Sequence, residues 1–164
     1  GEDQIYSYLG LLNVAVDSNV KSYIDIAIKY LKPKKAKMNE MQSDLFRIYY
    51  GEYLYKIKDY SGTILLLKSL SSKKNTITFP LIAPLYLDAL LDSGLKAEAI
   101  EYYRVHSSII DQNTNWEKLN DVLVKLAQAA MFFIVILPGD YGPPLRDCRR
   151  GVAPGAYASV RCVR

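Results

Sequence analysis

Apolar residues recur at helical spacing from residue 3 to residue 137, and this periodicity constrains the fold more than any other feature. Strand-like alternation is nearly absent, and the β-branched residues around positions 77–79 form the one ambiguous stretch. The pattern predicts seven helices, over residues 3–16, 20–32, 40–57, 60–71, 79–93, 96–110 and 115–137. The chain is therefore expected to be all-α.

The breaks between these helices carry residues with capping or helix-breaking chemistry. Pro33 should end the second helix, because proline cannot continue the hydrogen-bond ladder. Asp59 and Ser61 supply capping side chains for the fourth helix, and Gly94 suits the left-handed residue that follows the fifth. Residues 114–117, Thr-Asn-Trp-Glu, form a capping box that should open the last helix.

Both terminal helices are more apolar than an exposed end of a helical array should be. In the first helix, apolar residues spread around the axis: Ile5, Tyr8, Leu9, Leu11 and Leu12. In the last helix they form one long face: Trp116, Leu119, Leu123, Leu126, Ala130, Phe133 and Leu137. We expect these helices to pack on further repeats or on a second copy of the chain, as a homo-oligomer.

Composition places the chain among ordinary globular domains. Half of its 164 residues are hydrophobic and 23% are charged, which is enough apolar material for one core. The longest apolar run, residues 126–137, falls short of the roughly 20 residues that a membrane span needs. No signal peptide is visible, and the leading Gly in place of Met suggests an excised fragment or a tag scar. The predicted location is cytoplasmic, with no membrane partner.

The composition changes at Pro138. Residues 138–164 are rich in Gly, Pro and Arg, and they hold five of the 21 basic residues but two of the 17 acidic ones. Residues 1–137 form the predicted helical domain and are close to neutral. The tail is expected to be irregular or disordered. It is either foreign sequence, such as a vector read-through or a frameshift, or a basic arm for RNA or an acidic partner. Cys148 and Cys162 could form a disulfide, but no metal site is expected.

Small residues fall at regular places in the predicted helix pairs. One unit carries Tyr50, Gly51, Leu54, Asp59, Tyr60, Thr63, Ile64 and Leu67, and the next carries Leu90, Gly94, Ala99, Ile100 and Tyr103. Thr63 and Ala99 recur at close to the period of about 34 residues that tetratricopeptide repeats have. This pattern resembles the tetratricopeptide-like helical repeat family over roughly residues 5–110. Where helices cross closely, only small residues such as Gly51, Thr63 and Ala99 fit.

The resemblance implies antiparallel helical hairpins that stack as a short right-handed α-solenoid. Arg47 and Ala83 stand where the family has an aromatic residue, which leaves the subfamily open. Pentatricopeptide repeats, sel1-like repeats and the helical part of proteasome-lid-type subunits share much of the pattern. An unrelated helical bundle is the remaining alternative.

In the family, the first helix of each hairpin lines a concave binding face. The position of Gly51 sets the register by which this face is transferred to the present sequence. The resemblance then implies a groove that is lined by Ile48, Glu52, Tyr55, Lys56, Pro84, Asp88, Leu91 and Asp92. The lysine and asparagine clamp by which some members hold a C-terminal carboxylate is absent. The groove should be apolar and acidic, suited to a peptide or helix with apolar anchors and some basic residues.

The sequence carries no recognisable catalytic constellation, so an enzyme is not expected. It has no glycine-rich phosphate loop, and its single histidine, His106, is expected to be a packing or surface residue. Asp88 and Asp92 lie one helical turn apart and are expected to form a solvated acidic face that attracts a basic ligand. No cofactor is predicted.

The leading hypothesis is a protein–protein interaction scaffold that binds a peptide or helix in its groove. One alternative is the peptide-sensing domain of a bacterial transcription regulator, although the chain carries no helix-turn-helix of its own. Another is an RNA-binding helical-repeat module. Nucleic acid is not the expected partner, because phosphate contacts need a basic face and residues 1–137 are nearly neutral.

Overall fold

The computed structural model describes residues 2–73, 78–113 and 116–136. Within these ranges the chain is helical and contains no strand, so the all-α prediction is confirmed. The helices are α1 (Glu2–Asp17), α2 (Lys21–Leu31), η1 (Lys32–Lys37, a 3₁₀-helix), α3 (Glu40–Lys56), α4 (Tyr60–Leu67), α5 (Phe79–Asp92), α6 (Lys96–Asn113) and α7 (Trp116–Ile136).

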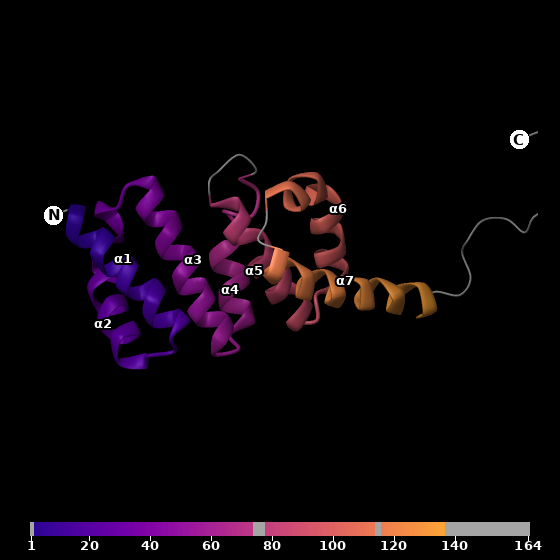
Figure 1. Cartoon of the computed structure of the whole chain (residues 1–164), viewed down its shortest axis with the longest axis horizontal. Coiled ribbons are helices and arrows are strands. Elements are labelled where there is room, and N and C mark those ends of the chain that lie inside the picture. The colour runs from indigo at the N-terminus through magenta and orange to yellow at the C-terminus, as the bar shows by residue number, and fades with distance from the viewer. Residues whose placement is uncertain (1, 74–77, 114–115, 137–164) are drawn as a thin grey trace, which may run out of the picture.

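Helices that are neighbours in sequence pack against each other along the molecule (Figure 1). The pairs α1–α2, α3–α4 and α5–α6 are joined by short turns or loops. Each odd-numbered helix also contacts the next odd-numbered one, from α1 through α3 and α5 to α7. The odd-numbered helices therefore form a continuous row, and this row positions the site described below.

Several helix ends differ from the sequence prediction, mostly by one residue, and α6 runs to Asn113, three residues past its predicted end. The second helix was expected to run to residue 32, but α2 ends at Leu31 and a 3₁₀-helix with Pro33 in its first turn follows. Proline has no amide hydrogen to donate, yet its fixed φ suits the start of a new helical turn. The fourth helix was expected to reach residue 71 but ends at Leu67. After Leu67 the chain forms tighter turns, in one of which the amide of Leu70 donates a hydrogen bond to the carbonyl of Leu67 at 2.8 Å.

The helix caps are largely those that the sequence predicts. Asp59 caps α4 by accepting a hydrogen bond from the amide of Gly62 at 2.9 Å. Gly94 follows α5 with a φ of 86°, the left-handed conformation expected there. A capping box of Asn39 and Gln42 opens α3 and was not predicted, with bonds of 2.9 and 3.1 Å. The predicted box at 114–117 lies outside the residues described in full.

The core consists of two clusters of buried side chains. The first joins α1, α2 and α3 and is built on residues such as Leu12, Ile24 and Phe46. The second joins α3 to α7 through residues such as Leu67 and Leu87. Tyr49 of α3 packs against both clusters, so one side chain connects the two halves of the core.

The three small residues expected at close crossings are buried. Thr63 and Ala99 are fully covered, and a Cβ placed on Gly51 would meet the side chain of Leu67 at 3.4 Å. The hydroxyl of Thr63 donates to the carbonyl of Gly51 at 3.1 Å and ties α4 to α3. The predicted close contact is confirmed at Gly51 and Thr63, between α3 and α4, and Ala99 is buried in the second core cluster.

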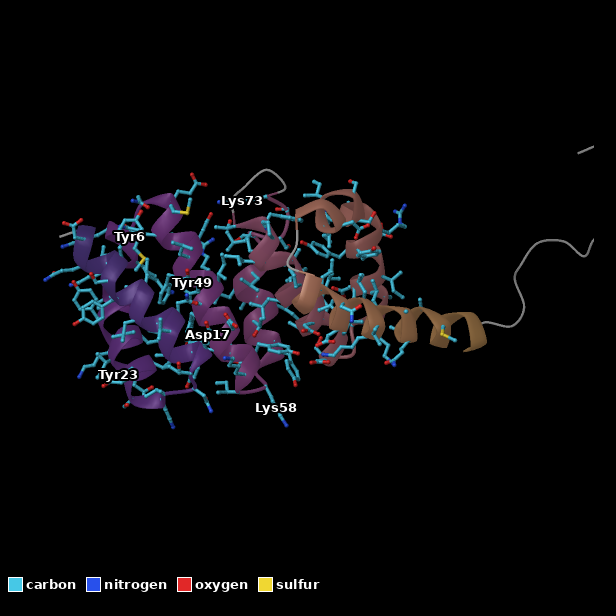
Figure 2. All side chains as sticks on the ribbon, viewed as in Figure 1. Tyr6, Asp17, Tyr23, Tyr49, Lys58 and Lys73 are labelled. Carbon is cyan, nitrogen blue, oxygen red and sulfur yellow. The ribbon has the colours of Figure 1, made fainter. Side chains whose placement is uncertain are left out.

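The apolar side chains that spread around the first helix are more buried than the sequence pattern predicts. Ile5, Leu9 and Leu12 are buried, and Tyr8 and Leu11 are partly buried in the same cluster. These five residues therefore pack at least in part within the cluster that α1 forms with α2 and α3. The packing of α1 on further repeats or on a second copy stays a prediction. The exposed large apolar side chains of this hairpin are Tyr6, Val14, Val20, Tyr23 and Ile26, of which Figure 2 labels Tyr6 and Tyr23.

The buried face of α7 is rotated relative to the predicted one. Leu119 and Leu126 are buried as expected, but Val122 and Ala129 complete the face. Leu123 and Ala130, which the prediction placed on it, are only half-buried. The side chains of Trp116, Phe133 and Leu137 lie outside the described set.

The predicted tail, residues 138–164 with Cys148 and Cys162, also lies outside the described part of the chain. Among the helices that are described, none combines the length and the apolar character that crossing a membrane requires.

Candidate functional site

The row of odd-numbered helices encloses a cavity of about 490 Å³. Its walls come from the C-terminal half of α1, from α3 and α5, and from one residue of α7. The even-numbered helices contribute no lining residue. The cavity thus lies on the side of the molecule formed by the odd-numbered helices, and its volume falls within the range of ligand-binding pockets.

The structure brings together most of the predicted groove residues. Ile48, Glu52, Tyr55, Lys56, Pro84 and Asp88 all line the cavity. Leu91 does not, because it is turned into the second core cluster and is only 9% exposed. Asp92 does not line it either, but it contacts the wall through Tyr55.

Seven further lining residues were missed: Asn13, Asp17, Tyr49, Pro80, Leu81, Leu85 and Asp121. Pro80 and Leu81 precede Pro84 by one helical turn, so helical spacing from a correctly placed residue could have found them. Asn13 and Asp17 lie in α1, ahead of the two repeat units from which the register was taken. Asp121 lies in α7, which the family pattern did not reach.

Apolar residues of α3 and α5 form a large part of the cavity wall. Ile48 comes from α3, and Pro80, Leu81, Pro84 and Leu85 come from α5. Pro84 lies inside α5, where its missing amide hydrogen leaves the carbonyl of Pro80 without the usual donor four residues on. Leu81 is 50% exposed and forms part of the rim.

Acidic side chains dominate the charge of the walls. Four lining residues are carboxylates, namely Asp17, Glu52, Asp88 and Asp121, and Lys56 is the one basic residue among them. The ammonium of Lys56 donates to the carbonyl of Val16 at 2.5 Å and so fastens α3 to the end of α1.

The negative charge of the walls affects the pKa of Tyr49. Burial raises the pKa of Tyr49, and the charges of Glu52 and Asp17 raise it further. Figure 2 labels Asp17 and Tyr49 where α1 and α3 lie together. The cavity is thus a place of negative potential with an apolar floor.

Lys125 of α7 occupies the predicted acidic pair. Its ammonium lies 2.7 Å from Asp88 and 3.3 Å from Asp92, and the hydroxyl of Tyr55 donates to Asp92 at 2.5 Å. The expectation that Asp88 and Asp92 form an open face for a basic ligand is therefore wrong. The basic group that pairs with both carboxylates is Lys125 of α7.

The pKa values of Asp88, Tyr55 and Lys125 are shifted in this network. Burial raises the pKa of Asp88 despite the ion pair with Lys125. Burial, and then the hydrogen bond to Asp92, raise the pKa of the Tyr55 hydroxyl. For Lys125, burial alone would lower the pKa, but the hydrogen bond and charge of Asp88, with Tyr55 and Asp92, outweigh it and raise the pKa. At neutral pH the network holds a protonated lysine and a protonated tyrosine.

His106 is a packing residue, as expected. It is 8% exposed, and its ring lies 4.5 Å from that of Tyr102 and 5.8 Å from that of Phe79, centroid to centroid. It also borders a second hollow, of about 500 Å³, between α5 and α6. Only those two helices form that hollow, whereas four helices converge on the first cavity, which is therefore the better candidate.

Within the described residues, no three His, Cys, Asp or Glu side chains gather closely enough to hold a metal ion. A scan against models of protein families, a search of curated proteins and a search of solved structures each returned no match.

Proposed function

We propose that this chain is a protein-interaction scaffold that holds a peptide or a helix of its partner in the cavity between the odd-numbered helices. The observation that carries the proposal is the convergence of α1, α3, α5 and α7 on one cavity of about 490 Å³. A concave, mostly apolar site with a few polar groups is the usual form of a ligand site.

The proposal includes the architecture that the sequence resembles, a short right-handed solenoid of tetratricopeptide-like hairpins over residues 1–137. Three features support it: the pairing of successive helices, the tight α3–α4 crossing at Gly51 and Thr63, and the burial of Ala99 in α6. In such an array the first helices of the hairpins line the concave face, and the cavity is lined by those helices alone.

The chemistry of the walls suits a peptide better than a nucleic acid. Tyr49 and Tyr55 offer flat, amphipathic surfaces that bind at low entropic cost, and Ile48 and Leu81 offer apolar contact. Four carboxylates against one lysine would repel phosphate groups. We therefore place the RNA-binding alternative behind the peptide-binding one.

A random-peptide display selection on the full chain tests the proposal. Bound phage would be sorted by a counter-screen against Leu81→Lys, which puts a charge on the apolar rim. Ile26→Lys is the matched control, because Ile26 lies on α2 and is equally exposed at 50%. Both variants should keep their free energy of unfolding within about 0.5 kcal/mol of the parent chain.

We expect peptides that bind the parent chain and Ile26→Lys but not Leu81→Lys. If every enriched peptide binds all three proteins equally, the cavity does not hold them and the proposal is wrong.

A further inference from the structure

Two of the four carboxylates that line the cavity come from its outermost helices. In helix order the row runs α1, α3, α5, α7, with each helix packed on the next. Asp17 comes from α1 at one end of this row, and Asp121 comes from α7 at the other. The apolar lining residues come from α3 and α5 between them, together with Glu52, Lys56 and Asp88. The apolar residues therefore have a carboxylate from an outer helix on each side.

The position of Asp17 is not explained by the stability of its own helix. It is the last residue of α1, where the helix dipole disfavours a negative charge, and α1 has no basic residue in its last turn. Asp17 and Asp121 are both exposed, so neither supports the core.

Asp88 has a different role from these two residues. Its carboxylate forms an ion pair with Lys125 at 2.7 Å. The charge of Lys125 offsets that of Asp88, so Asp88 attracts another cation less strongly. Asp17 and Asp121, on the two outer helices of the row, are the exposed carboxylates among the lining residues, and they can attract a cation of the partner.

From this arrangement we propose that the cavity selects segments in which a large apolar side chain is flanked on both sides by lysine or arginine. The inference rests on the proposed function and names the chemistry of its partner. The apolar side chain fills the floor against Ile48 and Pro84, and the two cations reach the carboxylates on α1 and α7. Lysine and arginine suit this geometry because their stems cover apolar surface while their charged ends reach outward.

The peptides from the display selection test the inference by their composition. Among those whose binding is lost with Leu81→Lys, we expect basic residues on both sides of a large apolar one. Cavity-dependent peptides with neutral or acidic flanks would overturn the inference and leave the proposed function standing. If no cavity-dependent peptide is found, both fail.

A second measurement addresses the two flanks directly. One enriched peptide, made synthetically with blocked ends, would be titrated against Asp17→Asn, Asp121→Asn and the double variant. Because these contacts are partly exposed to water, each single change should weaken binding by about threefold and the double change by about tenfold. The dependence of affinity on salt should also fall.

Asp25→Asn is the matched control, because Asp25 is an exposed carboxylate on α2 outside the cavity. It should bind the peptide as the parent chain does. Asp17→Asn should melt at the same temperature as the parent or higher, since it removes a charge that the helix end disfavours, so weaker binding cannot be due to unfolding. Unchanged affinity in the double variant would overturn the inference.

Discussion

Two helical glycines of this chain have very different surroundings. A Cβ on Gly51 would touch Leu67 at 3.4 Å across the α3–α4 crossing. A Cβ on Gly10 would meet nothing within 4 Å, because that side of α1 is open. Both glycines lie inside helices, and only the packing separates them.

Substitution should reveal this difference. Gly10→Ala should stabilise the chain by about 0.5–1 kcal/mol, which is the gain from replacing glycine inside a helix. Gly51→Ala gains the same propensity but presses on Leu67, so its net effect should be close to zero, and Gly51→Leu should cost about 2 kcal/mol or more. Urea denaturation measures all three. Equal stabilisation by alanine at both positions would contradict a close crossing at Gly51.

The lysines around η1 show what sequence could not supply at this scale. The ammonium of Lys34 lies 4.0 Å from the ring centre of Tyr30, and those of Lys32 and Lys35 lie 4.9 and 5.2 Å from Tyr50 and Phe46. Two of the three rings belong to α3. The lysines were visible in the sequence, but their partners depend on how η1 turns the chain between α2 and α3.

At the scale of helices, the local sequence pattern predicted which helices exist and in what order they follow. It could do so because helical periodicity and caps such as Asp59 and Gly94 act within a few residues. The cavity was predictable where the family register applied, as at Ile48, Glu52 and Asp88. It was not predictable on α1 and α7. Their contributions, Asp17 and Asp121, depend on how those helices are rotated against their neighbours, which is set by distant contacts.

The attachment of α7 gives a prediction at this scale. Lys125→Met keeps the apolar stem but leaves Asp88 half-buried without its partner. The side chain of Lys125 is 39% exposed, so with solvent screening we expect a loss of about 1 kcal/mol. Amide hydrogen exchange in α7 should quicken more than in α1.

Arg104→Met provides the comparison. It removes an ion pair with Glu101 that lies on the surface of α6, with side-chain exposures of 72% and 60%. No measurable change in stability is expected. A loss equal to that of Lys125→Met would mean that the Asp88 contact contributes no more than a surface pair.

For the whole molecule, the many tyrosines make stability sensitive to alkaline pH. Burial raises the pKa of Tyr49, Tyr55, Tyr86, Tyr102 and Tyr103, most strongly in Tyr55 and Tyr102. In the unfolded chain these groups lose their protons near pH 10, whereas the folded chain retains them. The folded state then binds more protons, so its stability falls as pH rises. The raised pKa of Lys125 acts in the same direction.

We expect the free energy of unfolding to be flat between about pH 7 and about pH 9 and to fall above about pH 10. Chemical denaturation at each pH, with tyrosinate absorbance recorded in parallel, measures this. Tyr102→Phe should reduce the slope above pH 10, although it also removes the hydrogen bond from Tyr102 to the carbonyl of Ser71 at 3.0 Å. Stability that does not change up to about pH 11 would contradict the burial of these hydroxyls.

The side chain of Tyr55 forms part of the cavity wall and also donates a hydrogen bond to Asp92. Asp92 and Asp88 both form ion pairs with Lys125 of α7. If the proposed ligand binds, one side chain thus takes part in two equilibria, the filling of the cavity and the docking of α7. Thermodynamic reciprocity then requires that whatever biases one equilibrium through Tyr55 biases the other by the same free energy. Tyr55→Phe would disturb both at once, so binding data from that variant alone could not be assigned to either.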